Sequence, residues 1–370
     1  MQRFRFPRLA PAILAAFPLT FLAGSASAQH YTQTNLVSNQ AGAAHTDASL
    51  VNGWGIARSA TSPWWISDNG PGKTTIYNVG TGVASSTITV PGAPTGVVFN
   101  GTSAFSVLGG APARFIFSSE DGTISAWNGG TKAQVVITTV GAVYKGIAIA
   151  TVGGNPQIYA ADFHNGHIDV FDASFQPVTK GKGKGDDHGK GDDQGDDNGF
   201  FSGKPRGFAP FNVQNIGDTL YVAFAKQDAA KHDEVDGPGM GLIGAFTPAG
   251  KLVQWFDHVA DLNAPWGLAL APSEFGTFSH HLLVGQFGSG EILAFNLASG
   301  AYAGKLLQPV AAGGGPISID GLWGIGFGSG FAASGPLNTL FFAAGPDGES
   351  NGLFGSLTTV STDLVQGNSN

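Results

Sequence analysis

Short apolar runs separated by glycine-rich polar turns are the dominant pattern of the chain. Residues 158–172 (IYAADFHNGHIDVFD) show it most clearly, because two runs of alternating apolar and polar residues flank a turn at Asn165-Gly166. Residues 282–296 (LLVGQFGSGEILAFN) align with them without a gap. Runs of β-branched and aromatic residues with a period of two, bounded by turn residues, are typical of β-hairpins. Helical periodicity is hard to find after residue 30, so the pattern predicts an all-β protein.

A second pattern, a glycine followed by an apolar residue, recurs six times. Its glycines, 41 to 61 residues apart, are Gly55, Gly96, Gly146, Gly207, Gly267 and Gly324. Units of this length, each with three or four short strands, fit a β-propeller. We therefore predict a six-bladed β-propeller with four-stranded blades, in which each glycine motif forms the innermost strand of its blade.

The ends of the repeat region predict how the ring closes. The sixth unit ends after its third strand, whereas residues 31–38 (YTQTNLVS) form an extra strand before the first unit. This N-terminal segment would supply the outer strand of blade six and leave no sheet edge at the seam. The outer strand of blade three is expected at residues 176–179 (QPVT).

The repeat resembles the NHL type of six-bladed propeller. The matching residues are Gly146-Ile147-Ala148, Asp162, Asn165, Ile168 and Phe171-Asp172. The chain also resembles a family of secreted bacterial propellers of uncharacterised function, on segments that include NGWGIA (52–57), PWGLALAP (265–272) and DGLWGI (320–325). Some members of that family end in a PEP-CTERM sorting tail, a pattern not found at the end of this sequence. The resemblance implies a fold and an export route but no reaction.

The N-terminus has the three parts of a secretory signal peptide. Arg3, Arg5 and Arg8 precede an apolar run, and the small residues Ala26-Ser27-Ala28 form an A-x-A cleavage site. Two prolines interrupt the run, which is short for a membrane span. We expect residues 1–28 to be removed, so that a single propeller domain of residues 29–370 is secreted or periplasmic.

The charge of the chain limits which kinds of partner it can bind, and its lack of cysteine limits how the fold is held together. The signal segment contains three of the 18 basic residues and no acidic residue, so the mature chain has 15 basic and 26 acidic residues and a net charge of −11. Such a balance disfavours nucleic acid and anionic membranes, which require clustered Lys and Arg. The sequence has no second apolar stretch long enough for a span and no cysteine, so a hydrophobic core must hold the fold. A monomer is expected.

Residues 180–199 (KGKGKGDDHGKGDDQGDDNG) contain four lysines, six aspartates and no apolar side chain. Blades are predicted on both sides of this segment, so it is not a linker between domains. Its composition cannot bury a core, which predicts a disordered low-complexity insertion. Specific Ca²⁺ binding is the less favoured interpretation, because Asp-Asp doublets lack the alternating spacing of known calcium loops.

Strand order predicts which face carries function. If the strands of a blade are named a to d from the channel outward, the b–c turns and the d–a connections lie at the same end of the ring. Most unusual polar residues fall there, and loops on a rigid scaffold are the usual place for binding groups. The candidates are His45, Asp47, Asp68, Asn69, Glu120, Asp162, His164, His167, Lys226, Asp228, His232, Asp233, Glu234 and Asp320. Asp347 and Glu349 lie in the corresponding turn of blade six.

Structural roles compete with metal binding among these residues. Weak metal candidates are Asp68, Asp162, Asp228 and Asp233, and Ca²⁺ is the cofactor that acidic loops would hold, although EF-hand spacing is absent. Asp68 and Asp162 equally fit caps of hairpin N–H groups. His164 and His167 span a tight turn but have no third ligand nearby in sequence, so a turn role is favoured over zinc.

Four tryptophans also have two interpretations. They are Trp54, Trp64, Trp266 and Trp323. Such residues stack on sugar rings or line pockets, but more often pack between blades, and packing is expected for at least two of them.

Two classes of function remain. The first is an exported propeller that binds a glycan, peptide or surface component through its loop face. The second is a Ca²⁺-dependent hydrolase or lyase at the channel mouth, which predicts that Asp68, Glu120, Asp162, His164 and Asp228 converge on one point. The sequence has no nucleophile elbow, phosphate loop or H-E-x-x-H motif. Binding is favoured, and whether the protein is an enzyme is left open.

Overall fold

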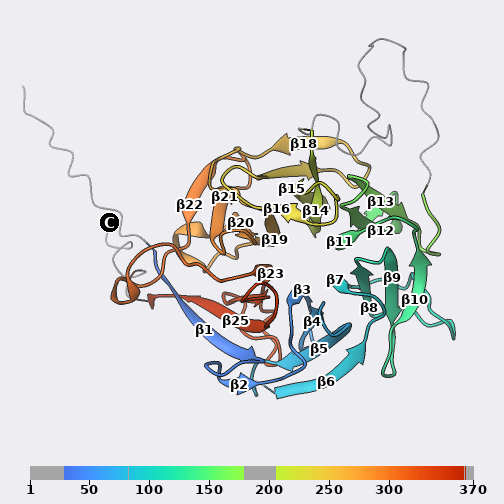
Figure 1. Ribbon diagram of the computed structural model, residues 1–370, viewed down its shortest axis with the longest axis horizontal. Coiled ribbons are helices and arrows are strands. Elements are labelled where there is room, and N and C mark those ends of the chain that lie inside the picture. Colours follow the sequence, from blue (N-terminus) through green and yellow to red (C-terminus); the bar gives the residue numbers. More distant parts are fainter. Residues whose placement is uncertain (1–28, 82, 179–205, 362, 364–370) are drawn as a thin grey trace, which may run out of the picture.

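The computed structural model describes residues 29–81, 83–178, 206–361 and 363. Six small antiparallel sheets are arranged around a central axis as the blades of a propeller (Figure 1). The protein is therefore a six-bladed β-propeller, as its repeats predict. The predicted signal peptide (1–28) and the insertion (180–199) lie outside the described residues.

Within each blade the strands follow one another in order from the axis outward. Blade one contains β3 (Gly53–Ala57), β4 (Trp64–Asp68), β5 (Lys73–Asn78) and β6 (Val83–Thr89); blade two contains β7 (Pro94–Phe99), β8 (Phe115–Ser119), β9 (Thr123–Trp127) and β10 (Gln134–Thr138); blade three contains β11 (Tyr144–Val152), β12 (Asn155–Asp162) and β13 (His167–Phe171). Blade four contains β14 (Phe208–Ile216), β15 (Thr219–Gln227), β17 (Gly241–Phe246) and β18 (Leu252–Trp255), with β16 (Glu234–Val235) paired to β15; blade five contains β19 (Pro265–Leu270), β20 (His281–Gln286), β21 (Ile292–Asn296) and β22 (Tyr302–Lys305). Blade six contains β23 (Leu322–Phe327), β24 (Leu340–Ala344), β25 (Leu353–Thr359), β1 (Tyr31–Ser38) and β2 (His45–Thr46). Two short 3-10 helices, Gly276–Phe278 and Val310–Ala312, lie in loops, and no helix of the described residues is both long and apolar enough to cross a membrane.

The N-terminal strand closes the ring, as predicted. β1 pairs antiparallel with β25, from Tyr31 opposite Thr359 to Ser38 opposite Leu353, with one bulge. It becomes the outer neighbour of β25, and in Figure 1 it runs along the rim of blade six. A strand from the start of the chain thus completes the last blade, which removes an exposed sheet edge.

Blade three departs from the four-stranded prediction. In the described part of the segment expected to be its outer strand, Pro177 forms only an isolated bridge with Phe171. The amide of Val178 donates to the carbonyl oxygen of Val170 at 2.8 Å. Within the described residues, strand d of this blade is therefore reduced to the contacts of Pro177 and Val178 with β13, and the sheet has three strands.

A ring of close backbone contacts surrounds the axis. The innermost strands place Gly55, Gly96, Gly146, Gly267 and Gly324 against the next blade. A Cβ added to any of them would come within 2.6 to 2.8 Å of a backbone atom of that blade, closer than real Cβ atoms approach. None of these five glycines has a positive φ. Glycine is therefore required here because a side chain has no space, and not because of the backbone conformation.

One of the six glycines predicted for the innermost strands, that of blade four, is wrong. Gly207 precedes β14 in a left-handed conformation (φ +77°) and does not belong to the ring. Asn212 occupies the ring position instead, after a bulge between Pro210 and Asn212. Its side-chain amide donates to the carbonyl oxygen of Trp266 in blade five at 2.8 Å. β14 and β15 consequently extend further toward the loop face than their counterparts.

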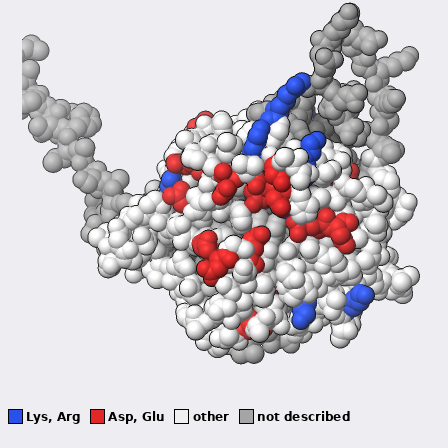
Figure 2. All heavy atoms as spheres, in the orientation of Figure 1, with Lys and Arg blue, Asp and Glu red and all other residues white. Residues whose placement is uncertain are grey.

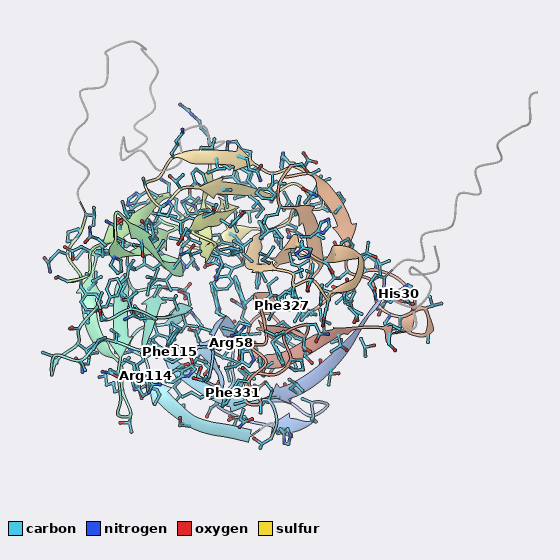
Figure 3. All side chains as sticks on the ribbon, turned by 180° about the vertical axis from the view of Figure 1, so that it is seen from behind. His30, Arg58, Arg114, Phe115, Phe327 and Phe331 are labelled. Atoms are coloured by element: carbon cyan, nitrogen blue, oxygen red, sulfur yellow. The ribbon has the colours of Figure 1, made fainter. Side chains whose placement is uncertain are left out.

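Hydrophobic clusters between adjacent blades form the core. Trp64 packs with Phe341 and Phe354 between blades one and six, and its indole N–H donates to the carbonyl oxygen of Ser334 at 3.0 Å. On the side seen in Figure 3, Arg58 of blade one donates from Nε to the carbonyl oxygen of Phe327 at 2.6 Å. Packing and polar contacts thus both join the first blade to the last.

Candidate site at the channel mouth

Six equivalent hydrogen bonds define the loop face. In every blade an N–H at the end of strand b donates to a carbonyl just before strand a, at 2.9 to 3.0 Å. The pairs are Asn69–Asn52, Glu120–Ala93, Phe163–Val143, Gln227–Gly207, Phe287–Ala264 and Gly345–Gly321. The b–c turns and the d–a connections therefore lie side by side, as the strand order predicts.

Aromatic side chains close the channel beneath this face. The residues that precede the six ring positions are Trp54, Thr95, Lys145, Phe211, Trp266 and Trp323. The rings of Trp54 and Trp323 are stacked with centroids 3.5 Å apart, and Trp266 meets both edge-on. All three are at most 4 % exposed, and the cavity along the ring has a volume of only about 20 Å³. The channel is plugged, and packing holds for all four tryptophans considered above.

Lys145 is the one charged residue among these six positions. Its side chain is fully buried, and its ammonium group lies 2.5 Å from Glu120 Oε1 and 3.1 Å from Asp233 Oδ1. The same group sits 5.0 Å from the centre of the Trp54 ring, an arrangement that stabilises a cation. The indole N–H of Trp266 fixes the backbone by donating to the carbonyl oxygen of Lys145 at 3.2 Å.

The extension of blade four brings the second carboxylate to Lys145. β16 pairs with β15 through Lys226 opposite Val235 and Gln227 opposite Glu234. This short hairpin places Asp233 and Glu234 beside the channel mouth rather than at the rim. Glu120 comes from the tight b–c turn of blade two.

A relay of amides connects Glu120 to blade one. Asn69 donates from Nδ2 to Glu120 Oε2 at 2.8 Å, and Asn52 donates from Nδ2 to Asn69 Oδ1 at 3.4 Å. Both Glu120 oxygens therefore have a partner, one cationic and one neutral, which fixes the carboxylate in place.

Burial and charge shift the titration of this cluster. Burial alone would lower the pKa of Lys145, but the negative charges of Glu120 and Asp233 raise it above its ordinary value. Burial would raise the pKa of Asp233, but Lys145 and His232 hold it below its ordinary value. Burial raises the pKa of Glu234 to about 7 and also raises that of Glu349, whose turn lies across from Asn52. The cluster thus combines a lysine that stays protonated with carboxyl groups that lose their protons at different pH values.

Two of the predicted carboxylates have structural roles. Asp162 accepts hydrogen bonds from the amides of Val143 and Asn165 and from the Asn165 side chain, which caps the hairpin. Asp68 accepts a hydrogen bond from the Thr75 hydroxyl at 3.2 Å inside blade one. Burial raises the pKa of both carboxyl groups.

The other predicted residues are spread over the face. Asp47 accepts from the Tyr77 hydroxyl, Asp228 from the His232 amide and Asp320 from the Asp347 amide. Lys226 donates to the carbonyl oxygen of Arg206, and His45 is exposed in β2. His164 contributes its backbone oxygen to the side chain of Gln227 at 3.2 Å.

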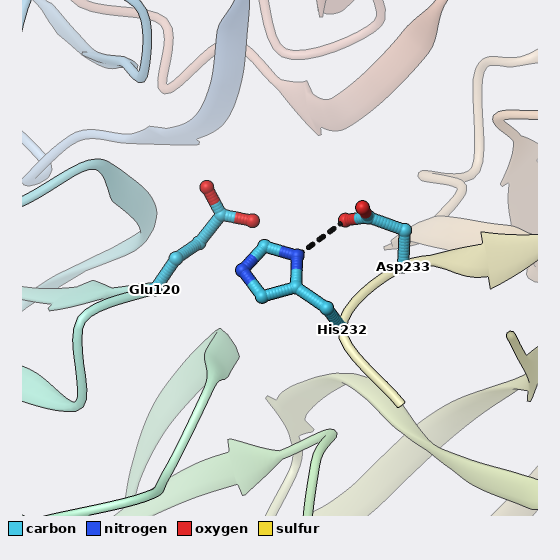
Figure 4. Close-up of side chains that lie close together, drawn as sticks. All are labelled: Glu120, His232 and Asp233. Carbon is cyan, nitrogen blue, oxygen red and sulfur yellow. Dashed lines mark hydrogen bonds and ion pairs between the residues drawn. The ribbon is translucent and has the colours of Figure 1, made fainter. Parts of the chain in front are cut away.

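Among the described residues, two groups of three side chains could hold a metal ion, because one ligand atom of each side chain lies within 4.8 Å of the others. They are Glu120, His232 and Asp233, shown in Figure 4, and Asp162, His167 and Asp169. The five residues expected to converge for a metal enzyme are not brought together, since each group contains only one of them. In the first group Lys145 already places a cation between Glu120 and Asp233. In the second, His167 Nε2 lies 3.0 Å from Asp169 and 3.9 Å from Asp162.

Sequence reasoning missed Lys145 and Asn52. Lys145 lies on an inner strand rather than on a loop, so its position on the chain gave no reason to group it with the polar turns. One signal was present: a lysine stands where three other repeats have tryptophan. Nothing in the local sequence distinguishes Asn52 from a turn residue.

Comparison with known proteins gives relatives of unassigned function. No family model matches the chain. "Uncharacterized protein L690" of Acanthamoeba polyphaga mimivirus is 33% identical over 332 residues, which cover 85% of this chain and 82% of that protein. "Uncharacterized protein R648" of the same virus is 31% identical over 340 residues, covering 87% and 78%. The predicted membership of a secreted bacterial family stays a prediction.

Solved structures show the same fold at low identity. A streptogramin B lyase superposes with a TM-score of 0.51 and 12% identity, covering 91% of this chain and all of the other. A protein of unknown function from Bacteroides thetaiotaomicron has a TM-score of 0.51 and 11% identity, covering 90% and 76%. These likenesses show the fold alone and carry no activity with them. At 33% identity over most of both sequences, the chain belongs to the same family as the mimivirus protein L690.

Proposed function

We propose that this protein is an exported binding module that holds a positively charged ligand, such as a basic peptide segment, at the channel mouth. Among the ligand classes considered from sequence (glycan, peptide or surface component), a cationic peptide fits the charge of the face best. Figure 2 supports this, because Asp and Glu side chains gather around the middle of the face drawn there. Export itself rests on the predicted signal peptide.

The arrangement around Lys145 is the observation that carries the proposal. Four carboxyl groups, those of Glu120, Asp233, Glu234 and Glu349, influence one another and Lys145 electrostatically. Lys145 offsets part of this charge but is buried and already bonded to two of the four. The mouth therefore presents uncompensated negative potential, which attracts cations and raises their local concentration.

Binding of a labelled tetralysine peptide tests this proposal. We expect saturable binding that weakens steeply between 20 and 500 mM salt, because salt screens exposed charges. A tetraglutamate peptide is expected not to bind. At pH 8, above the pKa of about 7 that burial gives Glu234, Glu234→Gln should weaken tetralysine binding several-fold, whereas Asp218→Asn, in the β14–β15 turn at the other end of blade four, should leave it unchanged. Equal binding of both peptides, or equal effects of both variants, would refute the proposal.

A metal-dependent hydrolase or lyase is the second candidate. The observation in its favour is the closeness of Glu120, His232 and Asp233, which supply ligand types suited to a divalent cation. One protein of the same fold, at 12% identity, is a streptogramin B lyase. Thermal unfolding with Ca²⁺, Zn²⁺ or EDTA separates the candidates, since a ligand of the native state raises its stability. A rise in Tm that His232→Ala abolishes would favour the enzyme.

A further inference from the structure

Two buried oxygen atoms at the mouth have no hydrogen-bond partner among the described residues. They are Oδ1 of Asn52, a residue only 5 % exposed, and Oε1 of Glu349. Asn52 Nδ2 is directed to Asn69, so the amide oxygen points the other way. There it faces Gly345, which opens the turn that carries Glu349 and whose lack of a Cβ makes room for the oxygen.

The two residues are neighbours across blades one and six. The Asn52 amide donates to the carbonyl oxygen of Asn351, two residues after Glu349, at 2.9 Å. Burial raises the pKa of Glu349 and an N–H of the Asn52 side chain lowers it by donating to the carboxyl group, which leaves Oε1 as the oxygen of that group without a partner. The Glu349 amide is held by the carbonyl oxygen of Gly345 at 3.1 Å, and the Gly345 amide by Gly321. The turn that positions the carboxylate is therefore itself hydrogen-bonded to the scaffold.

An unmatched buried acceptor costs free energy that a donor recovers. Both unmatched atoms here are acceptors, and one belongs to a carboxyl group, so the complementary group has several N–H donors and a positive charge. Asn52 has a positive φ (50°), a conformation that Asn adopts more readily than most residues other than glycine.

We propose that Asn52 and Glu349 form a seat for the primary ammonium group of the ligand, so that the ligand class is a lysine side chain or another primary amine. This inference rests on the proposed function and narrows it from any cation to one that donates several hydrogen bonds. Lys145 shows the same chemistry within the chain, because its ammonium group lies between two carboxylates and over an aromatic ring.

Methylation of the ligand distinguishes a hydrogen-bonding seat from charge attraction alone. Trimethyl-lysine keeps the positive charge but has no N–H donor. Binding of tetralysine and of tetra(trimethyl-lysine) is measured by fluorescence anisotropy on the full chain. The seat predicts at least tenfold weaker binding of the trimethylated peptide, because hydrogen bonds to charged groups are among the strongest in proteins.

Variants assign this preference to the two residues. Glu349→Gln and Asn52→Gly should each bring the ratio of the two affinities, tetralysine over its trimethylated form, close to one. Glycine is chosen at position 52 because it tolerates the positive φ there. Asp236→Asn removes one negative charge from an exposed position of the same face and should keep the preference. Far-ultraviolet circular dichroism and Tm confirm folding of each variant.

Each outcome has a distinct meaning. If both peptides bind equally to the wild type, the seat is wrong and the proposed binding of cations stands. If neither peptide binds, both proposals fail. If the preference survives in both Glu349→Gln and Asn52→Gly, the hydrogen bonds come from elsewhere and the assignment to this seat is overturned.

Discussion

The ammonium group of Lys145 lies 2.5 Å from Oε1 of Glu120, at the mouth of a channel that tryptophan rings close from below. Lys145 comes from the innermost strand of blade three and Glu120 from a turn of blade two. Asp233 of blade four joins them at 3.1 Å, so one cation links three consecutive blades. A metal ion holds carboxylates together in a comparable way, and here the chain supplies the cation itself.

Replacing Lys145 by methionine should therefore destabilise the protein and create a cation site. Removing one partner of a buried pair leaves an uncompensated charge and costs about 3 kcal/mol or more. Ca²⁺ should then raise the Tm of Lys145→Met more than that of the wild type, because the freed carboxylates are hard oxygen ligands. Differential scanning calorimetry with and without CaCl₂ measures both effects.

Lys305 provides a matched control for this experiment. It also contacts two carboxylates, those of Asp261 at 3.0 Å and Glu291 at 2.8 Å, but it lies on the outer strand of blade five and is partly exposed. Lys305→Met should cost about 1 kcal/mol or less. Equal losses in the two variants, or no calcium effect in Lys145→Met, would contradict the view that Lys145 substitutes for a metal.

Glu234 should make stability depend on pH. Burial raises its pKa from the ordinary 4.5 to about 7, so the folded protein keeps this proton over a range in which the unfolded chain has lost it. The resulting stability is fully present below about pH 4.5 and is lost as the pH rises to about 7. Glu234→Gln should remove this loss: relative to the wild type, the variant should gain stability from pH 4.5 to 7 and keep a constant advantage above.

Urea unfolding at pH 5, 6, 7 and 8 measures this difference. The low pKa of Asp233 acts in the opposite direction, and Glu349 in the same direction, so only the comparison of variant with wild type isolates Glu234. Glu274→Gln, at an exposed position of blade five, serves as the control and should show no pH-dependent difference. A flat difference for Glu234→Gln would mean that its carboxyl group titrates normally.

The blade count and the ring closure were predictable because both depend on local patterns. Hairpins such as β12–β13 have alternating residues and a turn signal in one short stretch, and Tyr31–Ser38 is a strand without a partner in its own unit. The position of Asn212 was not predictable in this way. The ring requires close backbone approach, and in blade four a bulge satisfies it without glycine, while Gly207 lies nearby as a misleading match.

The loop face was predicted, but the centre of the site was not. Glu120, Asp233 and Glu234 fall in turns, where polar residues attract attention. Lys145 lies between Tyr144 and Gly146 in an apolar strand, and its role depends on contacts with residues of two neighbouring blades. Only tertiary structure shows that a turn of blade four, about 90 residues later in the sequence, reaches the same point.

The ring contacts predict that Gly146→Ala destabilises the protein. A Cβ at this position would lie 2.7 Å from Asn212 Cα, so blades three and four would have to separate. Overpacking usually costs about 1–3 kcal/mol, and we expect the upper end because the obstacle is backbone. Gly101→Ala is the control, since its nearest neighbour is the Phe99 ring at an ordinary 3.5 Å. Similar urea midpoints for both variants would show that the ring tolerates expansion.

Tyr31 should carry much of the stability that ring closure provides. Its ring is fully buried against Phe275 and Phe278 of blade five, and its hydroxyl donates to the carbonyl oxygen of Phe275 at 3.0 Å. Tyr31→Ala should therefore cost about 3–5 kcal/mol in urea unfolding, as expected for a large aromatic deletion. Tyr31→Phe, which loses only the hydrogen bond, should cost about 1 kcal/mol. Thr32→Ala, exposed on the same strand, should cost little; if Tyr31→Ala were equally mild, β1 would pair with blade six without stabilising the ring.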